Sequence, residues 1–164
     1  MDIMVNINDS NHMSIFYLDK NPYIAAKYLY NKHICKMIIE SAQMLCTAHH
    51  HYDNGHNVPY AKAYYNHPST KWCRANTEHY YWLYYHLIGI GMEYEKRYGR
   101  EHLTASKCLI PLQHAPSGMP TTKFVQPPQC MPDQYKDKCS IVAYWRYYKA
   151  EKYKIATKKE TIIK

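Results

Sequence analysis

The spacing of apolar and polar positions along the chain predicts a protein built mainly from helices. A short apolar run over residues 14–19 reads as an extended or β-like segment. Asn21 and Pro22 follow it, a pair typical of a helix start in which the asparagine is the N-cap and the proline the first helical residue. Apolar residues then recur at helical spacing over about 33–48, which predicts a second helix.

The same periodicity predicts a long helix in the middle of the chain and another near its end. The central helix is expected from Ser69 to Arg97 without interruption, because apolar positions continue at helical spacing and Gly99 is suited to the C-cap. A last helical pattern covers about 140–154. These segments contain most of the apolar residues, so helices are expected to form the core.

Two stretches lack this periodicity. Residues 49–68 contain three consecutive histidines, an Asp-Asn-Gly turn signal and a proline, and are expected to form a loop. Residues 108–137 hold six of the nine prolines, which excludes a regular helix there. We therefore predict a mostly α fold over residues 14–155, a single compact helical domain with a long proline-rich irregular segment, flanked by a flexible extension (1–13) and a basic tail (156–164).

Composition narrows the class of protein. The chain has 164 residues, a formal net charge of +8 and an isoelectric point near 9.1. No run approaches 18 apolar residues and the first residues do not resemble a signal peptide, so we expect a soluble intracellular protein without a membrane partner. The positive charge favours a polyanionic partner, with nucleic acid first.

Neither a metal nor a cofactor is expected. The six cysteines include no CxxC pair and are expected to be reduced thiols. The three histidines that begin at His49 are read as a solvated polar tract, because no carboxylate or cysteine spacing completes a known metal site.

The helix over 33–48 carries a narrow polar strip on an otherwise apolar surface. Its members follow alternating steps of three and four residues, which places them in one line: His33, Lys36, Glu40, Gln43 and Thr47. The strip faces either solvent or a cleft. In a cleft, a neighbouring ammonium and burial would act in opposite directions on the carboxyl group of Glu40, which suits general acid–base chemistry. We take Glu40, His33, Lys36 and Gln43 as candidate catalytic residues and Thr47 as a candidate substrate contact.

The carboxy-terminal helix is aromatic and basic. From residue 144 onward, seven Lys and Arg against two Glu give +5 of the total +8. Such a run can contact phosphates and stack on bases, and equally it can be an amphipathic helix with its aromatic residues in the core. The candidate substrate contacts here are Trp145, Arg146, Tyr147, Tyr148 and Lys149.

Two polar residues of the central helix, Asn76 and His79, complete the candidate substrate contacts. They share a face with Trp72 and His86 and could form the opposite wall of a cleft. They could also be core polar groups whose hydrogen bonds are satisfied within the protein.

Several segments between residues 14 and 152 resemble a group of small phage-type proteins. The longest runs from Phe16 to His49, and shorter ones are HPSTKW, EYEKRYG, PPQCMPD and YWRYYKAEK. That group is in turn similar to the phage pyrimidine-dimer DNA glycosylases of the endonuclease V type, which are small, basic and all-α. Two features carry the similarity: a His and a Glu seven residues apart on an early helix, and a carboxy-terminal run of the W-x-K/R-Y-Y kind.

The resemblance implies a base-excision activity on DNA. An amine would attack the sugar C1′ to form a Schiff base, Glu40 would stabilise the sugar cation, and His33 and Lys36 would contact phosphate or orient Glu40. In the family the amine is the amino-terminal one, whereas Met1-Asp2 should retain its methionine. Initiation at Met13 would expose the amine of Ser14; otherwise a side chain such as Lys36 would serve, or the lyase step is absent. The arginines that grip phosphate beside the family's glutamate are absent.

The sequence therefore predicts a DNA-binding glycosylase or lyase that acts on damaged or modified bases. Two alternatives remain open from the residues alone. One is a non-catalytic protein that binds nucleic acid or takes part in a virus–host interaction. The other is an enzyme that acts on free nucleotides with the polar strip around Glu40.

Overall fold

The computed structural model describes residues 14–151, and this part of the chain is helical without any strand. The helices are α1 (Pro22–Lys27), α2 (Asn31–Asp53), α3 (Pro68–Ala75), α4 (Thr77–Tyr98), α5 (Leu103–Cys108) and α6 (Ser140–Ala150), with a 3-10 turn, η1 (Asp133–Tyr135), before α6. The predicted α class is confirmed for these residues. The expected extension 1–13, the tail 156–164 and the last residues of the helix predicted over 140–154 lie outside the described residues.

Local capping signals place several helix ends where the sequence predicts them. The side chain of Asn21 accepts hydrogen bonds from the backbone N–H groups of Tyr23 and Ile24, and Pro22 is the first helical residue of α1. Gly99 ends α4 in the left-handed conformation, with φ of 71°. The segment before α1 forms no strand; residues 14–18 are instead buried without regular structure.

The predicted single helix from Ser69 to Arg97 is wrong, because the chain breaks at Asn76. Asn76 is extended, with φ of −163° and ψ of 166°, and its side chain caps α4 by accepting a hydrogen bond of 3.0 Å from the N–H of His79. The N–H of Thr77 donates to the carbonyl of Pro120 rather than along a continuous helix. Asparagine competes with the backbone for hydrogen bonds, so it favours a cap over a helix interior.

The predicted loop over 49–68 also begins too early. α2 continues through the three histidines to Asp53, and Asn54 then ends it in the left-handed conformation with φ of 66°. The ring of His49 is held in the helix by Asp53, 3.0 Å from Nδ1, and by the hydroxyl of Tyr80, 2.9 Å from Nε2. Tertiary contacts therefore keep these residues helical, and the turn residues Asn54 and Gly55 act as the stop.

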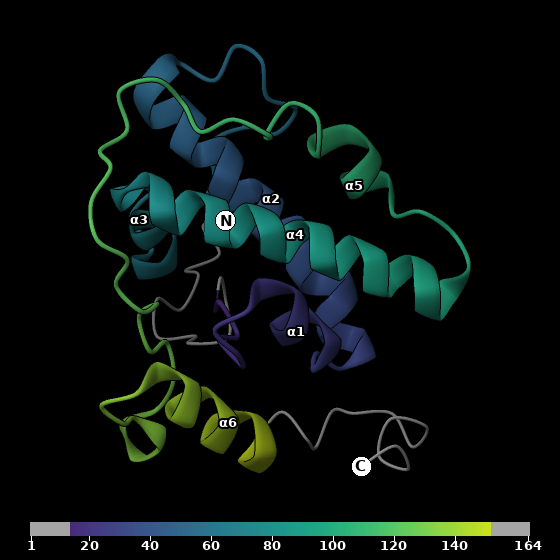
Figure 1. Cartoon of the computed structure of the whole chain (residues 1–164), viewed down its shortest axis with the longest axis vertical. Helices are drawn as coiled ribbons and strands as arrows, with labels where there is room; N and C mark the ends of the chain where they lie inside the picture. The colour runs from purple at the N-terminus through teal and green to yellow at the C-terminus, as the bar shows by residue number, and fades with distance from the viewer. Residues whose placement is uncertain (1–13, 152–164) are drawn as a thin grey trace, which may run out of the picture.

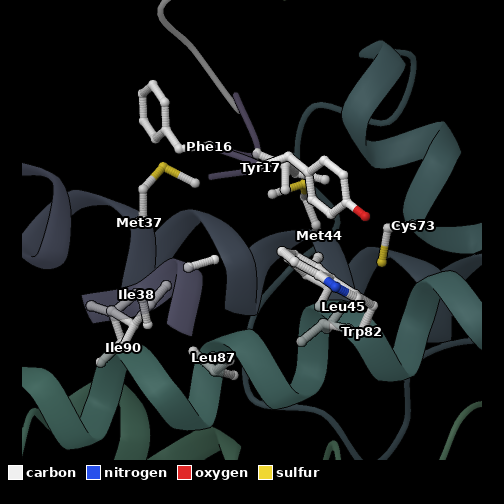
Figure 2. Close-up of a cluster of buried hydrophobic side chains, with 14 of the residues drawn as sticks. Phe16, Tyr17, Met37, Ile38, Met44, Leu45, Cys73, Trp82, Leu87 and Ile90 are labelled. Atoms are coloured by element: carbon white, nitrogen blue, oxygen red, sulfur yellow. The ribbon is translucent and has the colours of Figure 1, made fainter. Parts of the chain in front are cut away.

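The centre of the protein is the crossing of α2 and α4 (Figure 1). Figure 2 shows Met37, Ile38, Met44 and Leu45 of α2 facing Leu87 and Ile90 of α4, with Phe16 and Tyr17 of the amino-terminal segment above them. α1 approaches α4 closely at Gly89, where an added Cβ would lie 3.1 Å from Cβ of Ala26. These contacts fix the orientation of α2, the helix with the polar strip.

The chain between α5 and η1 contains neither helix nor strand over residues 109–132. It is tied to the helices by side chains: the hydroxyl of Tyr80 donates to the carbonyl of Leu112, and Nε1 of Trp72 donates to the carbonyl of Val125, both at 2.7 Å. The segment leads to α6, which lies at one edge of the protein near the amino-terminal segment (Figure 1). No described helix is long and apolar enough to cross a membrane.

Candidate functional site

The polar strip on α2 begins at a contact between α2 and α6. Nδ1 of His33 lies 2.8 Å from the hydroxyl of Tyr148, and the His33 ring stacks on Phe16 with centroids 4.6 Å apart. The same hydroxyl accepts a hydrogen bond of 2.7 Å from the N–H of Tyr30, the N-cap of α2. Both His33 and Tyr148 are buried. The two features on which the family resemblance rests are therefore in direct contact.

Lys36 and Glu40 form the next turns of the strip. Nζ of Lys36 lies 3.9 Å from Oε1 of Glu40, and the Glu40 side chain is only 11% exposed, against 33% for Lys36. A carboxylate that is largely shielded from water but next to an ammonium can stabilise positive charge more strongly than one in bulk solvent. The arrangement combines an amine and a carboxylate within one helical turn.

The strip is open at Gln43 and covered beyond it. Gln43 is half-buried, whereas Thr47 is fully buried and its hydroxyl donates to the carbonyl of Ala63 and accepts from the N–H of the same residue, at 3.2 and 3.1 Å. The hydroxyl of Thr47 therefore holds the loop after α2. Thr47 therefore has a structural role, and a substrate cannot reach its buried side chain directly.

The aromatic-basic run on α6 divides into buried and exposed residues. Tyr147 and Tyr148 are buried, while Arg146 and Lys149 are exposed. Arg146 pairs with Asp137, with Nη1 and Oδ2 3.1 Å apart. Trp145 is half-buried and its Nε1 donates to the carbonyl of Leu18 at 2.9 Å. The prediction that all five residues contact substrate thus has accessible candidates in Trp145, Arg146 and Lys149 only.

Sequence reasoning missed an aromatic residue that joins this surface. Tyr28, at the end of α1, is 47% exposed and lies edge-on to Trp145 with centroids 5.1 Å apart. Nζ of Lys149 lies 5.7 Å from the centroid of Trp145. The three residues form an aromatic-basic patch in which Tyr28 and Lys149 are exposed and Trp145 is half-buried. The contact between Tyr28 and Trp145 could not be predicted from the sequence, because it joins residues that lie far apart in the chain.

Asn76 and His79 lie at the junction of α3 and α4 and have their own partners there. Nδ1 of His79 donates to the carbonyl of Trp72 at 2.7 Å, and its Nε2 accepts from the N–H of Val125 at 2.9 Å. These bonds define a neutral ring, and burial lowers the pKa of His79. Among the described residues, the contacts of Asn76 and His79 are with this junction and the 120s segment, not with the strip on α2.

A separate cavity of about 550 Å³ opens between the amino-terminal segment, α4, the irregular segment and the start of α6. Three aromatic side chains, Tyr17, Trp82 and Phe124, form much of its wall, and Lys20 lies among the lining residues. None of the sequence-predicted site residues lines it. Within residues 14–151 no group of three His, Cys, Asp or Glu side chains is placed to hold a metal ion.

Comparison with known protein families gives a match that covers the strip. The family model described as pyrimidine dimer DNA glycosylase matches residues 13–106, more than half of the chain and all of α1 to α4. Neither the curated proteins nor the solved structures gave a match. The family that the sequence resembles is therefore confirmed: the chain belongs to the pyrimidine dimer DNA glycosylase family.

Proposed function

We propose that the protein is a DNA glycosylase and lyase acting on damaged or modified bases, with Glu40 as its catalytic carboxylate. The observation that carries this proposal is the shielded Lys36–Glu40 pair, which lies on α2 within the region that matches the family. Family membership supplies the substrate class, DNA with linked or altered pyrimidines. The shielding of Glu40 supplies a carboxylate whose charge acts in a partly water-excluded site.

The chemistry assigned to Glu40 follows from the bond changes of the reaction. An amine nitrogen adds to C1′ of the sugar while the bond from C1′ to the base breaks, and its electron pair leaves with the base. Positive charge develops on the sugar ring and is stabilised by the Glu40 carboxylate. Opening of the ring gives an imine between the amine and the sugar. Loss of the C2′ proton from this imine then breaks the bond between C3′ and the phosphate oxygen, so the phosphate leaves and the strand is nicked. Glu40 assists the accompanying proton transfers.

His33 and Tyr148 act as positioning residues in this proposal. Their contact ties the start of α2 to α6, so the strip and the aromatic-basic patch of Tyr28, Trp145 and Lys149 keep a fixed relation. The exposed cation Lys149 can neutralise a phosphate, and the two aromatic rings can stack on or wedge beside bases that leave the duplex.

The nucleophile is one of two amines. It is the α-amine of Ser14, if the working protein starts at Met13 and loses that methionine, or the side chain of Lys36. The substitution Lys36→Arg separates them, because a guanidinium keeps the charge beside Glu40 but does not form the imine. Strand cleavage that survives Lys36→Arg supports the α-amine, and its complete loss in a folded variant supports the lysine.

The test of the function is strand cleavage of an ultraviolet-irradiated duplex. We expect nicking at pyrimidine dimers by the unmodified chain and a loss of at least about 100-fold in Glu40→Gln, the usual scale for a catalytic carboxylate. Glu95→Gln is the matched control, since Glu95 is an exposed glutamate on α4. Absence of nicking and base release over a panel of damaged and modified duplexes would refute the proposal.

One observation favours a second candidate, an enzyme acting on free nucleotides. The aromatic cavity beside Tyr17 is large enough for a nucleotide, and Lys20 offers a cation near its three rings. Titration with nucleoside monophosphates, followed by the tryptophan fluorescence of the protein and compared with that of Trp82→Phe, tests this candidate. A lack of binding by any of them at millimolar concentration removes it.

A further inference from the structure

A second cationic cluster lies away from Glu40, where the loop after α2 meets the end of α3. Its centre is Arg74, which is only 8% exposed. The guanidinium carbon lies 4.0 Å from the ring centroid of Tyr65, and Nη1 donates to the carbonyl of the same residue at 2.6 Å. No carboxylate pairs with Arg74 among residues 14–151. Buried cations are usually paired, whereas Arg74 is held in place without a carboxylate partner among the described residues.

Further nitrogen groups gather at the same tyrosine. Nζ of Lys62 lies 5.1 Å from the Tyr65 centroid, and Nδ1 of His51 lies 2.6 Å from the Tyr65 hydroxyl. Both Lys62 and His51 are exposed. The remaining N–H groups of Arg74 make no hydrogen bond within the described residues, yet none of them is sealed from solvent. The cluster therefore presents positive charge outward, and no acidic residue in the described part of the chain forms an ion pair with it.

The backbone beside the cluster is strained. Tyr64 adopts a left-handed conformation, with φ of 47°, and its side chain is exposed, at 49%. For a bulky residue this conformation costs about 1–3 kcal/mol and is found mainly where function requires it. The hydrogen bonds between Thr47 and Ala63 fix the loop immediately before Tyr64. The loop is thus held with the exposed side chain of Tyr64 two residues along the chain from Lys62.

The cluster lies on the same side of α2 as Glu40. His51 follows His33 by 18 residues, which is five complete turns, so it continues the line of the polar strip. From Glu40 to His51 the helix rises about 16 Å, at 1.5 Å per residue. That distance is the rise of about five base pairs of B-form DNA at 3.4 Å each. One duplex that runs parallel to α2 and passes over the loop at Ala63, which covers Thr47, would therefore span both places.

We propose that His51, Lys62, Tyr64 and Arg74 form a second contact for the phosphodiester backbone of DNA, about five base pairs from the base processed at Glu40. Lys62 and Arg74 bind phosphate oxygens, and the ring of Tyr64 packs on the adjoining sugar or base. The inference rests on the proposed function for its partner, DNA. It adds a site of its own, because none of these residues is on the open part of the strip or on α6.

Two exposed positions allow the contact to be tested without disturbing the fold. Lys62→Ala removes a surface charge, and Tyr64→Asn removes the ring while asparagine tolerates the left-handed conformation. Lys96→Ala is the matched control, since Lys96 is an exposed lysine at the opposite end of α4 from α3 (Figure 1). Arg74 is left unchanged because it also holds Tyr65.

The measurement is the affinity for a lesion-containing duplex, by fluorescence anisotropy, in the full chain with Glu40→Gln so that no turnover occurs. At 0.1 M salt we expect Lys62→Ala to raise Kd about fivefold and to reduce the slope of log Kd against log salt by about 0.9, the value for one phosphate. Tyr64→Asn should raise Kd about threefold without changing the slope, because it removes no charge. Lys96→Ala should leave both quantities unchanged.

Shortening the duplex locates the contact. When fewer than about five base pairs remain on the side that reaches the loop, the duplex no longer contains the phosphate that Lys62 binds. The protein with Lys62→Ala should then bind this short duplex as tightly as the protein that retains Lys62. The same removal from the other side should leave the difference between the two proteins intact. A Kd and slope for Lys62→Ala equal to those of the control, on the full-length duplex, would overturn the proposal.

The outcome is separable from that of the proposed function. The binding measurement uses a chain without the catalytic carboxylate, so a failure of nicking by the unmodified protein leaves the loop result readable. If nicking occurs and Lys62→Ala matches the control, only the second contact is refuted. If no duplex binds at low salt, the second contact and the glycosylase reading fall together.

Discussion

The contact between Tyr148 and the start of α2 can be tested by removing a single oxygen. Tyr148→Phe keeps the ring that stacks on Tyr30, with centroids 4.5 Å apart, and removes the hydroxyl that lies 2.7 Å from the N–H of Tyr30 and 2.8 Å from Nδ1 of His33. Tyr148 is completely buried, so water cannot replace that hydroxyl without a local opening. The substitution therefore leaves the backbone N–H of Tyr30 and the imidazole of His33 without the hydroxyl that each contacts.

The magnitude follows from these two contacts. A buried polar group that loses its partner costs about 1–3 kcal/mol, and the two contacts share one oxygen, so we expect the free energy of unfolding to fall by about 2–3 kcal/mol. For a chain of this size that corresponds to a decrease of Tm of about 4–12 °C. Because α2 carries Glu40, the positioning role also predicts slower strand cleavage at temperatures where the variant is fully folded.

Urea unfolding of Tyr148→Phe, followed by circular dichroism, gives the free energy directly. Tyr94→Phe is the control: Tyr94 is also largely buried, but its hydroxyl makes no hydrogen bond within the described residues, so a loss below about 0.5 kcal/mol is expected there. If the unfolding free energy of Tyr148→Phe lies within about 0.5 kcal/mol of that of the control, the contact between α6 and α2 contributes nothing to stability and this prediction is refuted.

Two further predictions concern the helices that support the strip. Gly89→Ala should destabilise the protein by about 1–3 kcal/mol, because its Cβ would meet Cα of Tyr23 at 3.2 Å, whereas Gly91→Ala, 3.4 Å from Cβ of Ala105, should be neutral or slightly stabilising; equal denaturation midpoints would contradict this. Burial lowers the pKa of His86 to about 4. An unfolded histidine has a pKa near 6.5, so as the pH falls the unfolded state takes up the proton before the folded state does. The free energy of unfolding is therefore highest above pH 6.5 and decreases toward pH 4, by up to about 3 kcal/mol. His86→Gln should flatten this dependence, and an unchanged pH profile of the unfolding free energy would be evidence against it.

The helix ends that could be predicted from the sequence are those set by local chemistry. The cap at Asn21 and the left-handed glycine at position 99 depend on residues within a few positions of one another. The break at Asn76 was missed because apolar spacing continues across it, and what decides the break is a bond from Thr77 to the carbonyl of Pro120. That partner is distant in the chain and leaves no periodic signal.

The candidate site shows the same division. The line from His33 to Thr47 follows from helical spacing alone, and the structure places all its members on α2. Which part of the line is open depends on the loop that Thr47 binds at Ala63, and the burial of Tyr147 and Tyr148 depends on the way α6 packs. Amphipathic patterns do not state which face of a short helix is covered. The sequence therefore left both a nucleic-acid contact and the core open for Tyr147 and Tyr148, and the structure places both in the core.

The most direct test of the central claim is borohydride trapping on an ultraviolet-irradiated duplex. The reagent reduces an imine between enzyme and sugar to a stable amine, which is seen as a DNA adduct of the protein by electrophoresis. The account predicts an adduct with the unmodified chain, at the position of the dimer, and its loss in Glu40→Gln. An adduct that forms equally well in Glu40→Gln, or none with the unmodified chain on any damaged duplex, would contradict the claim that Glu40 directs a glycosylase reaction.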